Sequence, residues 1–137
     1  MIVDLVEDSG EGFAFIRIFG KQQNEIESLV RAVRRLETGE ADSFFVEALP
    51  GFQTQDRMSL EARASDRDSG VLRADLDKSF LWKQTRDTWN VVEGLISGVV
   101  PICSHDEFQW LAGPLARYGL EKSNIGVLLS TSNSGQW

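Results

Sequence analysis

The chain has very few of the residues on which most enzymes and metal proteins depend. Among its 137 residues are one histidine, His105, and one cysteine, Cys103. A lone cysteine forms no intrachain disulfide, which favours a reducing compartment, and we predict a cytoplasmic protein. Every Ser-His-Asp triad would have to use His105. The sequence also lacks G-x-S-x-G, the phosphate-binding loop and G-x-G-x-x-G.

Long apolar runs and an excess of positive charge are missing too. The longest nearly apolar run, residues 91–103, is interrupted by Glu93 and Pro101 and is shorter than the roughly 20 residues that cross a bilayer. Asp4 and Glu7 stand where an export signal needs basic residues. The net charge of −7 argues against nucleic acid as a partner and favours a cationic protein or simply solubility. We therefore expect neither a membrane nor a nucleic-acid partner.

What is present indicates a single folded domain, residues 1–137. The chain is 42% hydrophobic and contains no linker-like stretch. A chain of this length buries roughly two-thirds of its unfolded surface. Only residues 130–137 are polar enough to be predicted as a flexible tail.

The clearest helix is predicted over residues 24–38. An apolar stripe at helical spacing would pack on a sheet. Asn24 and Glu27 resemble a capping box at its start, and Gly39 is a stop signal at its end. The stripe consists of Ile26, Leu29, Val30, Val33 and Leu36.

Strands are predicted on both sides of this helix. Apolar segments at 13–19, 44–49 and 125–129 read as strands. Residues 60–65 and 72–77 alternate apolar and polar side chains, which is typical of half-buried antiparallel strands. Because the link between these two is short and turn-rich, we predict a hairpin that buries one face. That face would carry Leu60, Ala62, Leu72, Ala74 and Leu76, and the second strand would continue through Phe80-Leu81-Trp82.

Two further helices are predicted in the second half of the chain. Thr85 or Asp87 would cap the first, which carries Trp89 and ends at Pro101. Gly94 and Gly98 weaken this helix, and their spacing suggests that another element approaches closely there. Ser104-His105-Asp106-Glu107 is a capping box for a shorter helix containing Phe108, Leu111, Ala112 and Leu115. The fold class is therefore α+β, with a mainly antiparallel sheet and about three helices.

Candidate chemistry is sparse. Cys103, His105, Asp106 and Glu107 are possible metal ligands, but adjacent residues at a helix start diverge, and the capping box accounts for this segment. Asp75 and Asp77 would lie about 6.5–7 Å apart on one strand face, a glycosidase-like spacing. A solvated strand face, with Arg73 and Lys78 nearby, is the preferred explanation of these two residues. We predict no catalytic residue, no metal and no cofactor.

Binding is the remaining class of function. Trp is unusually frequent, with four residues, and it is favoured at interfaces. Trp89 is expected in the core. The carboxylates of the hairpin, with Asp66 and Asp68 at its turn, exceed the nearby Arg63, Arg67 and Arg73. The tentative binding residues are Glu61, Asp75, Asp77, Trp82 and Trp110. The alternative binding surface is the basic cluster Arg31, Arg34 and Arg35, which would suit an acidic partner.

One family resemblance supports binding. Phe80-Leu81-Trp82, then Trp89 to Leu95, a last strand and a Ser-x-x-Gly-x-Trp end resemble small acidic immunity proteins of bacterial toxin–immunity systems. The resemblance covers about a third of the chain and implies a non-catalytic inhibitor that plugs the active site of a basic toxin. The alternative is a small-molecule-binding or enzymatic domain with a pocket between sheet and helices, lined by Trp82 and Trp89. The sequence leaves a homodimer open.

Overall fold

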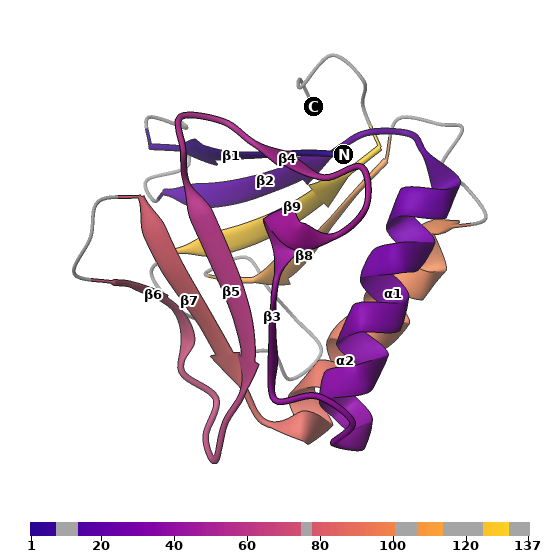
Figure 1. Cartoon of the computed structure of the whole chain (residues 1–137), viewed down its shortest axis with the longest axis vertical. Coiled ribbons are helices and arrows are strands. Elements are labelled where there is room, and N and C mark those ends of the chain that lie inside the picture. The colour runs from indigo at the N-terminus through magenta and orange to yellow at the C-terminus, as the bar shows by residue number, and fades with distance from the viewer. Residues whose placement is uncertain (8–13, 75–77, 101–106, 114–124, 132–137) are drawn as a thin grey trace.

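A computed structural model of the chain describes residues 1–7, 14–74, 78–100, 107–113 and 125–131. These residues form an α+β structure with two α-helices, α1 (Gln23–Thr38) and α2 (Arg86–Val99), and a 3₁₀ turn, η1 (Val46–Ala48) (Figure 1). Neither of these two helices has the length and apolar character that a membrane span requires. The strands are β1 (Ile2–Val6), β2 (Phe15–Phe19), β3 (Ser43–Phe45), β4 (Gln53–Thr54), β5 (Ser59–Ala64), β6 (Gly70–Arg73), β7 (Ser79–Gln84), β8 (Phe108–Ala112) and β9 (Gly126–Ser130).

The strands form two mixed sheets. The five-stranded sheet has the order β4-β1-β2-β9-β8, and the four-stranded sheet has the order β3-β5-β7-β6. Three strand pairs are parallel: β1 with β4, β2 with β9, and β5 with β7. The prediction of an α+β fold is confirmed, whereas one mainly antiparallel sheet with about three helices is only partly matched. Neither β1 nor β4 was predicted, and the two strands lie side by side at one edge of the five-stranded sheet.

The predicted hairpin between residues 60–65 and 72–77 is wrong. β7 lies between β5 and β6, parallel to β5 and antiparallel to β6, so the strand through Phe80 is a separate element. The phase of β6 also differs: Val71 is buried, while Leu72 is 43% exposed and Ala74 is exposed. Leu76 lies outside the described residues. Because Val71 and Leu72 are both apolar, alternation alone could not choose which of them faces the core.

Helix α1 matches its prediction closely. All five residues of its apolar stripe are buried, and its end at Gly39 is confirmed by the left-handed φ of 84° there. The predicted cap at Asn24 is wrong, because Gln22 occupies the cap position and makes no side-chain hydrogen bond there. In the first turn, the carboxylate of Glu25 instead pairs with the amino nitrogen of Met1.

Helix α2 is capped as predicted by Thr85, whose side chain accepts a hydrogen bond from the Thr88 backbone N–H (3.2 Å). The predicted close approach at Gly94 and Gly98 is wrong, since a Cβ at either position would meet no atom within 4 Å. Both glycines face solvent. They are therefore weak points of the helix with no packing role in the described structure.

The predicted helix through Phe108 and Leu111 is also wrong. Residues 108–112 form β8, which pairs antiparallel with β9, with a register shift between Trp110 and Ala112. β9 is buried along its whole length, so pairing with it outweighs the local capping signal. Ser104, His105 and Asp106 lie outside the described residues. The 3₁₀ turn similarly replaces the second half of the strand predicted at 44–49.

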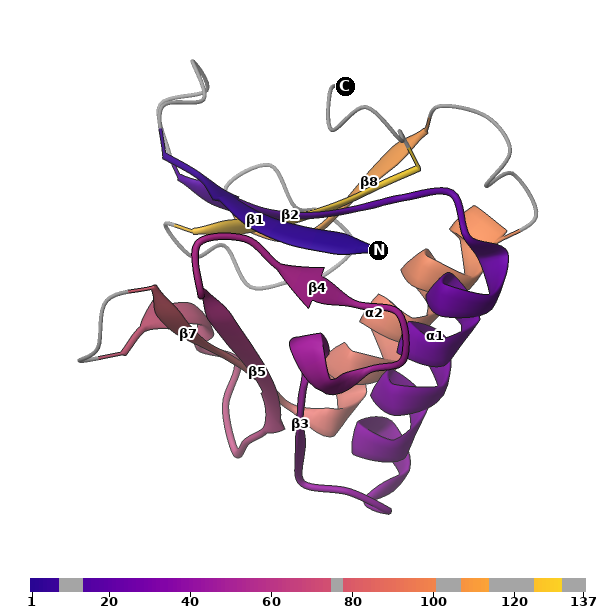
Figure 2. The same cartoon turned by 45° about the horizontal axis from the view of Figure 1, so that its top comes forward.

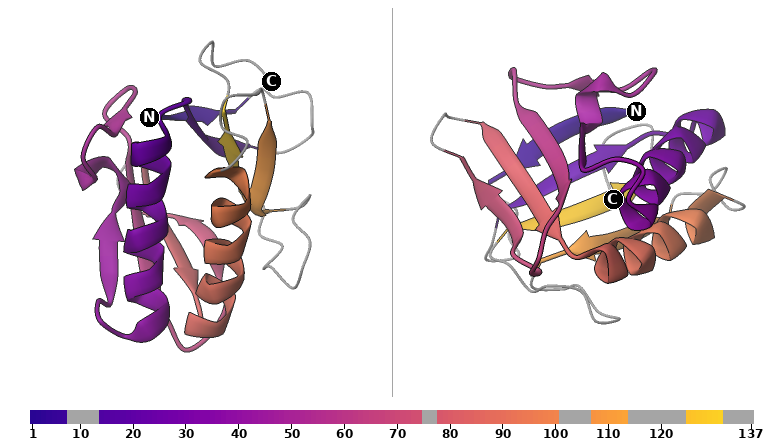
Figure 3. Two further views of the ribbon diagram at one scale, coloured as in Figure 1. Left: turned by 90° about the vertical axis from the view of Figure 1, so that its right-hand side faces the viewer. Right: turned by 60° about the horizontal axis from the view of Figure 1, so that its bottom comes forward.

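The two sheets face each other at an angle, and the antiparallel helices α1 and α2 lie along one side of them (Figures 2 and 3). One hydrophobic core joins all of these layers. Val3 and Ile18 contribute from the five-stranded sheet, Leu60 and Ala62 from the four-stranded sheet, and Val33 from α1. The α1 stripe therefore shares a core with Leu60 and Ala62, whereas Leu72 and Ala74 of the predicted sheet face are exposed.

Candidate protein-binding surfaces

The tryptophans of the tentative binding set lie in the interior. Trp82 is 1% exposed and packs against the fully buried Trp89, with 4.7 Å between ring centroids. Trp110 is 9% exposed and makes an edge-to-face contact with Phe15 at 5.2 Å. Trp82 and Trp89 therefore occupy the space between β7 and α2 where the alternative hypothesis placed a ligand pocket. Trp137 lies outside the described residues.

The carboxylates of the predicted acidic cluster do not form one surface in the described structure. Asp75 and Asp77 lie outside the described residues, and Asp66 is exposed. Asp68 points instead at the start of α2, where its carboxylate accepts hydrogen bonds from the Thr85 N–H (2.7 Å) and the Thr88 hydroxyl (2.9 Å). Its role is thus to hold the β5–β6 loop on the helix.

The buried side of this network involves Gln84, which is fully buried. With its amide nitrogen turned towards Asp68, Gln84 donates to Asp68 Oδ1 (3.2 Å) and its oxygen accepts from Trp82 Nε1 (3.1 Å). The Trp89 indole N–H donates to the backbone oxygen of Arg63 (3.0 Å). Both indoles are therefore satisfied internally. The partner of Trp82 is Gln84, two residues further along β7, whereas the partner of Trp89 lies on β5, which the sequence alone could not place beside α2.

Glu61 remains on the surface, in a row of side chains that crosses the four-stranded sheet. In the registers of the three strand pairs, Phe45 lies opposite Glu61, Glu61 opposite Leu81, and Leu81 opposite Leu72. Directly paired residues share one face of a sheet, and this face is opposite to that of the buried Leu60 and Trp82. Phe45 is 46% exposed and Leu72 is 43% exposed.

The neighbouring row adds charge. Arg63 lies opposite Lys83, and the Arg63 guanidinium binds Glu61 at 2.6 Å. We define the outer sheet face as Phe45, Glu61, Arg63, Leu72, Leu81 and Lys83. It combines three apolar side chains with an ion pair, so it can make both apolar contacts and hydrogen bonds. The sequence indicated Glu61 alone, since the row exists only in the strand order β3-β5-β7-β6.

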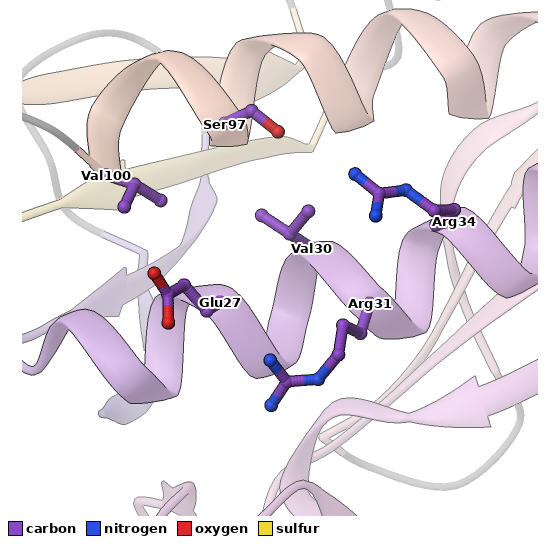
Figure 4. Close-up of a pocket in the computed structure, with 6 residues that line it drawn as sticks. All are labelled: Glu27, Val30, Arg31, Arg34, Ser97 and Val100. Atoms are coloured by element: carbon purple, nitrogen blue, oxygen red, sulfur yellow. The ribbon is translucent and has the colours of Figure 1, made fainter.

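A second candidate surface lies on the helices. An open groove of about 390 Å³ runs between α1 and α2 and is lined by Glu27, Val30, Arg31, Arg34, Ser97 and Val100. Figure 4 shows Val30 and Arg34 directed towards α2 and Arg31 directed away from it. The Arg34 guanidinium bridges the helices by binding Glu93 (2.6 Å).

A further open groove of about 320 Å³ lies beside α1, against the segment that follows η1. It is lined by Ser28, Arg31, Ala32, Arg35, Leu49 and Pro50. Arg31 lines both grooves. The sequence had marked these three arginines as a cluster, and the structure brings them together on the exposed side of α1.

Of the four candidate metal ligands named from the sequence, only Glu107 lies within the described residues. Within the described residues there is no group of three or more His, Cys, Asp and Glu side chains that could hold an ion. Cys103 and His105 lie outside them.

Comparisons with known protein families, curated proteins and solved structures gave no significant match to this chain.

Proposed function

We propose that this chain is a non-catalytic protein-binding domain, an immunity-type inhibitor of a basic bacterial toxin, and that it docks through its outer sheet face. The observation that carries the proposal is the row Phe45, Glu61, Leu81 and Leu72, in which three apolar side chains, two of them exposed, lie beside one carboxylate. Contiguous exposed apolar side chains are a common feature of protein-interaction sites.

The composition of this face supports docking. An aromatic side chain, two leucines and an arginine are present, and aromatic residues and Arg are enriched at interfaces. The Arg63–Glu61 pair supplies a hydrogen-bonding centre between apolar neighbours. Burial of an exposed Phe or Leu stabilises a complex by about 1.5–3 kcal/mol at most. The two most exposed residues alone could therefore contribute strongly to affinity.

The net charge supports a basic partner. A charge of −7 attracts a cationic protein over several ångströms and raises the association rate, especially at low salt. The outer sheet face itself carries one carboxylate, Glu61, and two cations, Arg63 and Lys83, so it does not supply this attraction. We thus assign steering to the whole molecule and affinity to the apolar contacts.

The test uses the product of the gene adjacent to this one, co-expressed with the chain in a bacterial host. We expect a one-to-one complex, rescue of growth, and an association rate that falls with salt. The double variant Phe45→Ser with Leu72→Ser should weaken binding about 100-fold, since each change removes one apolar anchor. Phe108→Ser, at an exposed phenylalanine on β8, is the matched control.

Circular dichroism and thermal melting establish that each variant is folded. An adjacent product that neither binds nor is neutralised contradicts the inhibitor assignment. Unchanged affinity in a folded double variant contradicts the assignment of the outer sheet face. If Phe108→Ser weakens binding as much as the double variant does, the assignment of the outer sheet face is also contradicted.

A further inference from the structure

Arg31 has an unusual position on α1. It lies on the exposed side of the helix, between the groove towards α2 and the groove towards Leu49 and Pro50. Apolar side chains line each groove together with Arg31: Val30 and Val100 in one, Leu49 in the other. Arg31 therefore borders two hollows that can each receive an apolar group.

Arg31 is also uncompensated, in contrast to its two neighbours. Arg34 binds Glu93 at 2.6 Å, and Arg35 lies 3.8 Å from Glu40. Among the described residues, Arg31 makes only a hydrogen bond to the Ser28 hydroxyl (3.1 Å) and has no carboxylate partner. An arginine in this setting can still form a bidentate bond with an incoming carboxylate.

We propose that Arg31 and its two flanking grooves bind an acidic segment of a partner polypeptide. A carboxylate of the segment pairs with the Arg31 guanidinium, and apolar side chains on either side of that carboxylate enter the two grooves. Glu27 lies one helical turn before Arg31 in the groove towards α2 and repels a second carboxylate there. The segment therefore places its acid at Arg31, away from Glu27 and from the Arg34–Glu93 pair.

The choice of a polypeptide follows from charge and shape. Nucleic acid and anionic lipid surfaces carry dense negative charge, which a molecule of net charge −7 repels far more strongly than it repels a single carboxylate on a polypeptide. Both hollows are open, so they cannot enclose a small anion, but together they can receive a chain that crosses α1. This inference does not depend on the outer sheet face, which lies on the four-stranded sheet.

The experiment selects random short peptides displayed on phage for binding to the intact chain, with counter-selection against the Arg31→Gln protein. We expect the recovered peptides to carry Asp or Glu beside apolar residues. A synthetic copy should shift the NMR signals of Val30, Ser97 and Val100. Arg31→Gln should weaken its binding about tenfold, because a charge-assisted hydrogen bond is lost. Arg67→Gln, at an exposed arginine in the β5–β6 loop, should leave binding unchanged.

The other outcomes overturn the proposal. They are the absence of enriched peptides, enrichment of neutral or basic ones, and shifts that map away from the two grooves. Equal binding to the Arg31→Gln protein also overturns it. If inorganic phosphate at the same concentration as the peptide causes the same shifts, the site is a simple anion site and the assignment to a polypeptide is wrong.

Discussion

Replacing glycine by alanine should have opposite effects at two places in this fold. Gly94 lies within α2, faces solvent, and leaves its Cβ position empty to 4 Å. Alanine is favoured over glycine in a helix interior by about 0.8–1 kcal/mol, and here nothing offsets that gain. Gly94→Ala should therefore raise the melting temperature by about 3–5 °C for a chain of this length. Gly98→Ala should gain less, because Gly98 lies one residue before the end of α2 at Val99.

Gly113 presents the contrasting case. Its φ of +104° is rarely adopted by other residues, and a Cβ there would lie 2.3 Å from the Cα of Gly126. Backbone strain of this kind costs about 1–3 kcal/mol, and the collision with β9 adds to it. Gly113→Ala should thus cost at least about 3 kcal/mol and lower the melting temperature by about 10 °C or more.

Thermal melting followed by circular dichroism gives the melting temperature of each variant, and urea titration at a fixed temperature gives its free energy of unfolding. The two variants are chemically the same substitution, so each serves as the control for the other. If Gly94→Ala destabilises the protein, then the exposed side of α2 is covered in solution and our account of it fails. If Gly113→Ala melts like the parent, then the close approach of β8 and β9 is wrong.

Two further predictions concern polar contacts. Asp68→Ala should lower the free energy of unfolding by about 2–3 kcal/mol in urea titration, because two buried donors at the start of α2 lose their acceptor. Asp66→Ala, its exposed neighbour, should change it by less than about 0.5 kcal/mol. Asp4→Ala breaks the half-buried pair with Arg17 (2.6 Å) and should cost about 1–2 kcal/mol. Glu7→Ala, in an ion pair whose glutamate is 65% exposed, should cost less than about 0.5 kcal/mol and serves as its control.

Elements whose signals are local could be predicted from the sequence. The stripe of α1 has one apolar face and a terminal glycine, so its burial and its end both followed from periodicity. The Thr85 cap of α2 is local in the same sense. The capping boxes at Asn24 and Ser104 show the limit of such signals. At Asn24 the pattern lies two residues beyond the actual cap position, Gln22, and after the pattern at Ser104 residues 108–112 pair with a fully buried strand instead.

Strand order could not be predicted, because it depends on which strands bury the most apolar surface together. β5 and β6 are neighbours in sequence, but β7 carries Phe80 and Trp82 on its inner face and lies between them. The same arrangement buries Trp82, which the sequence analysis assigns to the binding site. The two-residue alternation of a strand places Trp82 on the same side as Phe80, and this side contacts α2.

The candidate site changed for the same physical reason. Charges counted along the hairpin suggested an acidic face, but a count along the chain includes side chains that turn inwards, as Asp68 does. Once β7 separates β5 from β6, it adds Leu81 and Lys83 to the face that carries Glu61. The polar face expected of a two-stranded hairpin thus becomes a mixed face, in which three apolar side chains lie beside an ion pair and a lysine. If this chain binds a basic partner, the net charge therefore governs how fast the two meet, and the apolar row governs how long they stay together.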